Sequence, residues 1–81
     1  MESIRWDRNV LQLLDQRRLP HTISWVNIST WMDAERAIAD MVVRGAPAIA
    51  ITAAYGLALA VKAGDNRAKA AQALSRSRPT A

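Results

Sequence analysis

The sequence of 81 residues contains no cysteine, no phenylalanine and only one histidine. Without cysteine, the chain has no disulfide bond, no thiolate metal ligand and no thiol nucleophile. One histidine leaves too few ligands for a zinc site or a facial-triad iron site, so we expect no metal site. The histidine itself, His21, follows Pro20 in a polar turn without a serine and carboxylate nearby, and we assign it no catalytic role.

Long apolar runs and strong charge clusters are also scarce. The longest apolar run, residues 46–61, has 16 residues, contains Pro47 and is rich in alanine. A membrane span needs about 20 apolar residues, so this run predicts a buried helix and no membrane partner. The first residues lack the order of a secretory signal, which predicts a cytoplasmic location. The net charge of +4 is spread over all segments, so we attribute it to solvation and expect no nucleic-acid partner.

The first part of the chain has the pattern of a small sheet. Ile4 and Trp6 alternate with polar residues, and residues 10–15 predict a second strand that forms a hairpin with the first. Residues 22–28 are rich in β-branched side chains and predict a third strand. Its alternation slips between Trp25 and Val26, which indicates a bulge.

The second part has helical periodicity. Thr30 is a natural N-cap with an acidic residue three positions later, and the helix that it starts is expected to end near Arg44, with Gly45 as a left-handed C-cap. Pro47 fits the first turn of a second helix that ends near Lys62, is apolar nearly all round and is expected to be the central core element. A short third helix is expected at residues 67–75. The predicted fold is therefore α+β, with a three-stranded antiparallel sheet at about 3–28 followed by three helices at about 31–75.

Arg44, Gly45 and Ala46 form the strongest candidate site, because they place a fixed positive charge and free backbone N–H groups at a helix start. In one interpretation, Arg44 complements the end of the preceding helix and pairs with Asp40. In the other, its guanidinium binds phosphate oxygens bidentately while the N–H groups of Gly45 and Ala46 add backbone donors. The residues alone leave both interpretations open.

Three further features have structural and functional interpretations. Arg78 precedes Pro79, which favours an extended backbone and a defined direction for the arginine if this segment docks; otherwise Arg78 is a solvated surface residue. Asp15 is expected to cap a strand end or to pair with Arg17 or Arg18. The three tryptophans are expected to be core or interface anchors, since no basic stripe lies between them.

Motifs through most of the chain resemble those of methylthioribose-1-phosphate isomerase, an aldose–ketose isomerase of methionine salvage. They occur in the order of that family: Ile4-Arg5-Trp6, residues 13–20 (LLDQRRLP), residues 40–49 (DMVVRGAPAI), Ala53-Ala54-Tyr55-Gly56 and residues 77–81 (SRPTA). The resemblance implies that Arg44, Gly45, Ala46 and Arg78 bind the sugar phosphate. It also implies interconversion of 5-methylthioribose 1-phosphate and 5-methylthioribulose 1-phosphate without a dissociable cofactor.

The same resemblance implies that residues 1–81 form only the N-terminal domain of such an enzyme. The catalytic cysteine and aspartate of the family lie in a larger, Rossmann-like C-terminal domain, and this chain has no cysteine. We therefore expect no catalytic residue here, half of a binding site, and no isomerase activity in isolation. The expected partners are the sugar phosphate, the C-terminal domain and, since the family forms dimers as a rule, a second copy.

Two departures and three alternatives accompany the resemblance. The family usually has glycine where this chain has Ala50, and the segment between Val61 and Arg78 is short. One alternative is a non-catalytic regulatory or assembly domain like those of translation initiation factor 2B subunits, and another is a fragment of ribose-1,5-bisphosphate isomerase. The third is a small basic module that binds nucleic acid or protein, for which strongly salt-dependent binding to DNA or RNA is expected.

Overall fold

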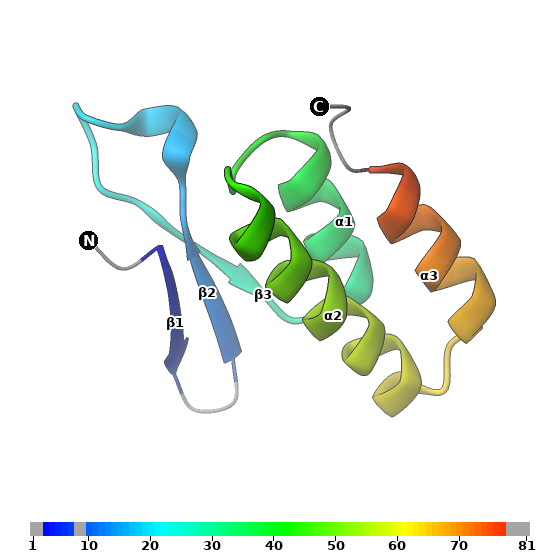
Figure 1. The fold of residues 1–81 in the computed structure, drawn as a ribbon. Coiled ribbons are helices and arrows are strands. Elements are labelled where there is room, and N and C mark those ends of the chain that lie inside the picture. Colours follow the sequence, from blue (N-terminus) through cyan, green and yellow to red (C-terminus); the bar gives the residue numbers. More distant parts are fainter. Residues whose placement is uncertain (1–2, 8–9, 78–81) are drawn as a thin grey trace.

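A computed structural model describes residues 3–7 and 10–77, and it places a three-stranded sheet beside three helices (Figure 1). The sheet is antiparallel, with strand order β1-β2-β3. This arrangement confirms the predicted α+β order of strands and helices. The elements are β1 (Ile4–Asp7), β2 (Val10–Leu14), a single 3-10 turn η1 (Gln16–Arg18), β3 (Trp25–Ile28), α1 (Trp31–Ala39), α2 (Ala46–Ala63) and α3 (Arg67–Arg76).

The sheet has one apolar and one polar face. Leu11, Leu13 and Ile28 are fully buried in the core that the sheet shares with the helices. On the other face, Nε of Arg5 donates to Oε1 of Gln12 at 2.7 Å, and Nε2 of Gln12 donates to Oδ1 of Asn27 at 2.8 Å. These residues are direct cross-strand partners, so the polar ladder fixes the register of all three strands.

The predicted bulge between Trp25 and Val26 is wrong. Strand β3 pairs with β2 in unbroken register from Leu14↔Trp25 to Leu11↔Ile28. The slip in alternation arises because the strand begins only at Trp25, three residues later than predicted. The ring of Trp25 lies on the polar face, where the guanidinium carbon of Arg5 is 4.0 Å from its centroid.

Helix α1 begins as predicted but ends earlier. Oγ1 of Thr30 accepts from the N–H of Asp33 at 3.1 Å, and the Asp33 carboxylate accepts from the N–H of Thr30 at 3.2 Å, which completes a capping box. At the other end, the N–H of Met41 bonds to the carbonyl of Ile38 and that of Val42 to the carbonyl of Ala37. These bonds form a Schellman motif in which Met41 has φ of 61°.

The expected helix end near Arg44, with Gly45 as its C-cap, is therefore wrong. Met41 takes the left-handed position because Val42 and Val43 fold back over the end of α1 and are buried, at 4% and 2% exposure. Burial of these two valines favours the early end over a longer helix. Gly45 instead becomes the N-cap of α2.

Met41→Gly should stabilise the chain by about 0.5–1 kcal/mol, because glycine adopts positive φ without the steric cost that a side chain incurs. Met41 is 45% exposed, so little packing is lost. Met32 is 49% exposed and lies inside α1, so Met32→Gly makes the same chemical change and should destabilise the chain by about 1 kcal/mol. Urea unfolding of both variants measures the two signs, and destabilisation by Met41→Gly would contradict the assignment of strain.

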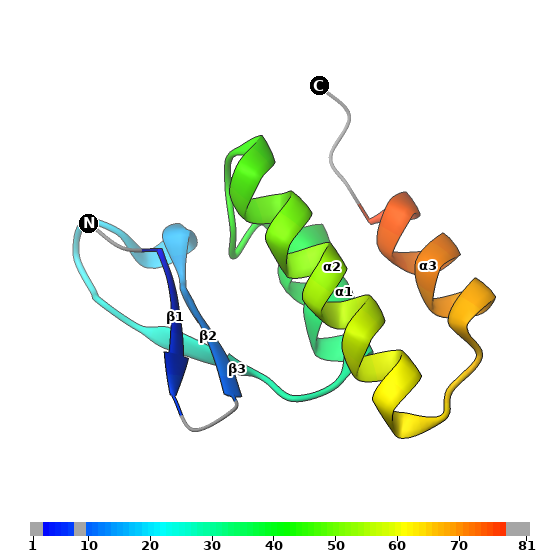
Figure 2. The same cartoon turned by 60° about the horizontal axis from the view of Figure 1, so that its bottom comes forward.

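Helix α2 packs closely on one side only. Its buried residues Thr52, Gly56 and Ala60 lie one turn apart, and a Cβ atom added at Gly56 would come within 2.8 Å of Cβ of Ala34 in α1. Figures 1 and 2 show α2 against α1, with the sheet and α3 to either side. On the opposite side, Ile51 is 50% exposed, so the prediction of a buried central core helix holds for one side of α2 only.

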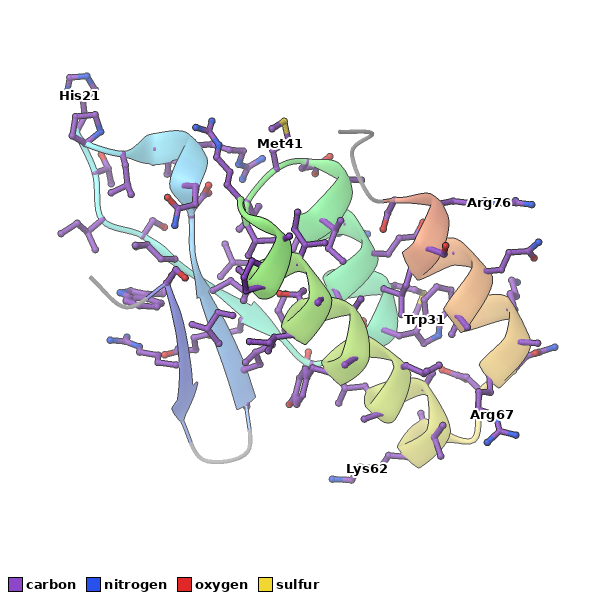
Figure 3. The ribbon with its side chains drawn as sticks, in the orientation of Figure 1. His21, Trp31, Met41, Lys62, Arg67 and Arg76 are labelled. Atoms are coloured by element: carbon purple, nitrogen blue, oxygen red, sulfur yellow. The ribbon has the colours of Figure 1, made fainter. Side chains whose placement is uncertain are left out.

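The length and composition of α2 also meet the criterion for a membrane-crossing helix, although core helices of soluble proteins meet it too. The buried face of α2 packs on both α1 and α3, since Gly56 lies against Ala34 of α1 and Leu74 of α3. Both of these neighbouring helices carry charged residues. The α2–α3 turn is tied to α1 because Nε1 of Trp31 donates to Oδ2 of Asp65 at 3.1 Å. In Figure 3, Trp31 reaches from α1 toward α3.

Candidate functional site

The start of α2 exposes backbone N–H groups beside a glycine. Gly45 is the N-cap, with φ of 91° and ψ of 136°, and no side chain from residues 3–7 or 10–77 caps this helix end. The first bond back to the N-cap is donated by the N–H of Ile49 to the carbonyl of Gly45, at 3.0 Å. Pro47 has no N–H, so Ala46 and Ala48 supply the orphan donors of the first turn. Such a helix start favours an anion.

Arg44 lies in the loop between α1 and α2, directly before this glycine, and it is exposed. Among the described residues, the ion pairs are those that Asp15 makes with Arg17 and Arg18, so Arg44 and Asp40 form none. Because α1 ends at Ala39, Arg44 is not a last-turn cation of that helix. The interpretation of Arg44 as a helix-end cation paired with Asp40 is therefore wrong, and its guanidinium is available to a ligand.

An open depression of about 490 Å³ surrounds these groups. Pockets for small ligands are commonly about 300–1,000 Å³, so a sugar phosphate fits this size class. The strand β1 side of the depression was not predicted from the sequence, because only the docking of the hairpin beside α2 brings Ser3 and Ile4 to Arg44. The lining residues are Ser3, Ile4, Arg44, Gly45, Pro47, Ala48 and Ile51.

A second cleft, between β3 and α1, is less suited to an anion. Its volume is about 120 Å³, and the carboxylates of Asp33 and Asp40 share it with Arg17 and Arg36. The Asp33 carboxylate is engaged in the capping box, and the Arg17 guanidinium is bonded to Asp15. The cleft is thus small and charge-balanced, which leaves the depression at Arg44 as the better anion site.

Asp15 has a structural role, since it caps the η1 turn and binds Arg17. It is 1% exposed, and its carboxylate accepts from the backbone N–H, Nε and a terminal nitrogen of Arg17 at 2.9–3.0 Å. Nε of Arg18 lies 3.5 Å away. Hydrogen bonding from the Arg17 side chain, opposed by burial, lowers the pKa of Asp15 from 3.8 to about 2. Both predicted roles, cap and arginine partner, are confirmed.

The other predicted positions fall in three places. Ala46 is the first residue of α2, next to the depression, whereas Arg78 lies outside the described residues. Ala50 is exposed, so its methyl group crowds no packed contact within the described chain. His21 is exposed at the far tip of the β2–β3 connection and points away from the molecule (Figure 3).

Comparisons with known proteins bear on this site. No protein-family model matches the chain. The methylthioribose-1-phosphate isomerase of Synechococcus sp. (strain CC9902) is 51% identical over 79 residues, which cover 98% of this chain and 24% of the relative. The crystal structure of 5-methylthioribose 1-phosphate isomerase from Pyrococcus horikoshii OT3 superposes with a TM-score of 0.84 at 30% identity, covering 96% of this chain and 24% of that one.

A second solved structure has a different name. Subunit delta of the translation initiation factor eIF-2B from A. fulgidus superposes with a TM-score of 0.82 at 36% identity, covering 99% of this chain and 26% of that one. The chain thus spans about a quarter of the length of the relatives that it matches. The resemblance to methylthioribose-1-phosphate isomerases is confirmed over nearly the whole of this chain, and the sheet-then-helices fold is shared with both structures.

Proposed function

We propose that this chain forms the substrate-binding N-terminal part of a methylthioribose-1-phosphate isomerase and holds the phosphate of the sugar at the start of α2. The observation that carries the proposal is the exposed Arg44 beside the uncapped helix start at Gly45, in a depression of ligand size. The identity of 51% with a relative named for this activity supports the choice of sugar phosphate. The proposal also implies that the protein acts in methionine salvage and is located in the cytoplasm.

The side chain and the backbone at this site contribute different interactions with a phosphate. The guanidinium of Arg44 contributes full positive charge and two parallel N–H donors, which match two phosphate oxygens. The N–H groups of Gly45 and Ala46 contribute short donors, and the absence of a side chain at Gly45 lets the phosphate approach the backbone. We assign Arg78 to the same phosphate by its motif alone.

The isomerisation moves a carbonyl between C1 and C2 of the sugar, which requires groups that transfer hydrogen at those carbons. The described site offers donors but no cysteine, and no carboxylate or histidine lines it. Uniform binding of substrate without such groups gives no rate acceleration. We therefore propose that the chain binds the substrate but that its purified form yields no ketose product.

Arg44→Ala should weaken binding of methylthioribose 1-phosphate roughly 10- to 30-fold, because it removes a charge-assisted hydrogen-bonded pair at an exposed site. Two-dimensional amide NMR measures the affinity, and the shifts should concentrate at Gly45, Ala46 and Ala48. Inorganic phosphate should shift the same amides with lower affinity than the sugar phosphate.

The matched control is Arg67→Ala, which removes an exposed arginine from the start of α3, outside the depression. This variant should keep the wild-type affinity. An equal loss of affinity in both variants would instead indicate a general effect of net charge, and the site at Arg44 would be rejected. Strongly salt-dependent binding to RNA or DNA in place of the sugar would support the basic-module alternative.

The superposition with the initiation factor subunit supports a second candidate, a non-catalytic regulatory or assembly domain. Arg44 distinguishes the two, because an assembly domain has no need of an unpaired arginine at an open helix start. If the titration gives no saturable shift with either phosphate ligand while the amide spectrum stays dispersed, the regulatory role becomes the better proposal.

A further inference from the structure

The loop that joins α1 to α2 carries Arg44 outside any helix or strand. It runs from Asp40, the C-cap of α1, to Gly45, the N-cap of α2. Arginine has many rotamers, and its guanidinium binds a phosphate bidentately only when the backbone that carries it keeps a fixed position. The position of this loop therefore determines whether Arg44 meets a phosphate together with the N–H groups at the start of α2.

The loop is bonded on two sides at Val42. The N–H of Val42 donates to the carbonyl of Ala37 in α1 at 2.9 Å, and its own carbonyl accepts from the N–H of Gln16 in η1 at 2.9 Å. Its side chain is buried, at 4% exposure. Figures 1 and 2 both show the blue η1 turn beside the green loop. The residue two positions before Arg44 is thus held between α1 and η1.

The η1 turn is itself held in place by Asp15. The N–H of Asp15 donates to the carbonyl of Ser24 at 2.8 Å, and its carboxylate caps η1 and binds the guanidinium of Arg17. Arg17 also lines a cleft with Asp40, at the beginning of the loop. The pKa of Arg17 is raised above its ordinary value by hydrogen bonding to Asp15 and, less strongly, by the charge of Asp40. A connected set of contacts therefore runs from the buried Asp15 to the loop.

We propose that Gln16 is a positioning residue for the phosphate site: its backbone N–H, on the turn that Asp15 caps, fixes Val42 and with it Arg44. The proposal rests on the proposed function, because it states how the same site is kept in its binding conformation. Gln16 and Asp15 lie outside the depression, so they act through the loop and do not touch the ligand. A loop that holds the binding conformation for only a fraction of the time lowers the apparent affinity by that fraction.

Gln16→Pro removes this single donor. Gln16 is the first residue of η1, where the φ of proline fits, and Asp15 before it has φ of −74° and ψ of 99°, which suits a residue that precedes proline. The Cδ atom of proline replaces the hydrogen, so the carbonyl of Val42 must move away. Amide NMR titration should show affinity for methylthioribose 1-phosphate weakened about 3- to 10-fold, as expected if the loop keeps its place about 10–30% of the time.

Two control variants separate this donor from other effects. Gln16→Ala removes the same side chain, keeps the N–H and should keep the wild-type affinity. Arg67→Pro is a matched proline at the first position of α3, where Asn66 before it has φ of −66° and ψ of 106°, and it should also keep the affinity. Equal weakening in either control would overturn the proposal, as would wild-type affinity in Gln16→Pro.

The order of the loop without ligand separates a failure of this proposal from a failure of the proposed function. NMR order parameters of the Arg44 and Gly45 amides should be about 0.85 in the wild-type chain and in Gln16→Ala, and below about 0.6 in Gln16→Pro. If the wild-type chain binds no sugar phosphate, the proposed function fails, and these values still determine whether Gln16 fixes the loop. Unchanged order in Gln16→Pro would overturn the proposal even if the affinity falls.

Hydrogen exchange of the wild-type chain tests the proposal without a variant. Because coupling between two sites is reciprocal, a bound ligand must strengthen the bond from Gln16 to Val42 by the factor by which that bond strengthens binding. Saturating methylthioribose 1-phosphate should therefore slow exchange at the Gln16 amide about 3- to 10-fold more than at the Lys69 amide, which is bonded to the cap residue Asn66 of α3. Equal slowing at both amides with the ligand bound would overturn the proposal.

Discussion

Gly56→Ala should lower the free energy of unfolding by about 2 kcal/mol, although alanine is intrinsically the better helix former by about 1 kcal/mol. The new methyl group would lie 2.8 Å from Cβ of Ala34, with both methyl groups of Leu74 at 3.3 Å. The Cβ atom of Ala34 is fixed to the backbone of a packed helix and cannot rotate away from the new methyl group, so α1 and α2 must move apart. A domain of this size has a total stability of about 5 kcal/mol, so the loss should be easily measured by urea unfolding.

A double-mutant cycle isolates this contact. Ala34→Gly removes the methyl group that the new side chain would meet. The double variant should therefore lose less free energy of unfolding than the two single variants lose together, by about 1 kcal/mol or more. If Gly56→Ala alone is stabilising, or if the two changes are additive, α1 and α2 do not approach as closely as described.

Asp15→Ala should lower the free energy of unfolding by about 2–3 kcal/mol at neutral pH. The substitution removes the buried carboxylate that receives three hydrogen bonds from Arg17 and that caps the η1 turn. Thermal and urea unfolding measure the loss. Arg17→Met keeps much of the length of the side chain but removes its two hydrogen bonds to Asp15. This variant should therefore lose part of the same free energy of unfolding.

The pH dependence of stability provides an independent measurement of the same carboxylate. The pKa of Asp15 is about 2 in the folded chain against an ordinary 3.8, so the unfolded chain takes up the proton first as pH falls. The stabilisation is therefore complete above about pH 5 and is lost between about pH 4 and pH 2, by about 1–2 kcal/mol once the half-exposed Arg17 is allowed for. Asp15→Asn should lack this decrease, and an unchanged profile would contradict the assignment.

Much of the fold was predictable because its signals are local. The capping box at Thr30 and Asp33, the alternation of the first two strands and Pro47 in the first turn of α2 all depend on residues within a few positions of each other. The end of α1 was not predictable in this way, since burial of Val42 and Val43 outweighed the preference for glycine at the left-handed position. That preference is worth about 1 kcal/mol, which is less than two buried valines contribute.

The candidate site was predictable in part for the same reason. Arg44, Gly45 and Ala46 are consecutive, and the helix start that they precede is visible in the sequence. Ser3 and Ile4 were missed because they precede Arg44 by about forty residues in the sequence, and only the docking of the β1–β2 hairpin beside α2 brings them to it. The exposed side of α2 was missed because composition alone does not tell a helix covered on all sides from a helix with one free face.

The contacts of this fold join elements that are close in chain order. The strands pair in sequence, β3 leads into α1, and the helices pack on one another as α1, α2 and α3. As the chain leaves the ribosome, each new element therefore meets a surface that has already been synthesised, and each strand pairs with the next strand in the sequence. Among the described elements, none that follows α2 covers its outward side, where Ile51 and Val61 remain 50% and 53% exposed after α3 has packed.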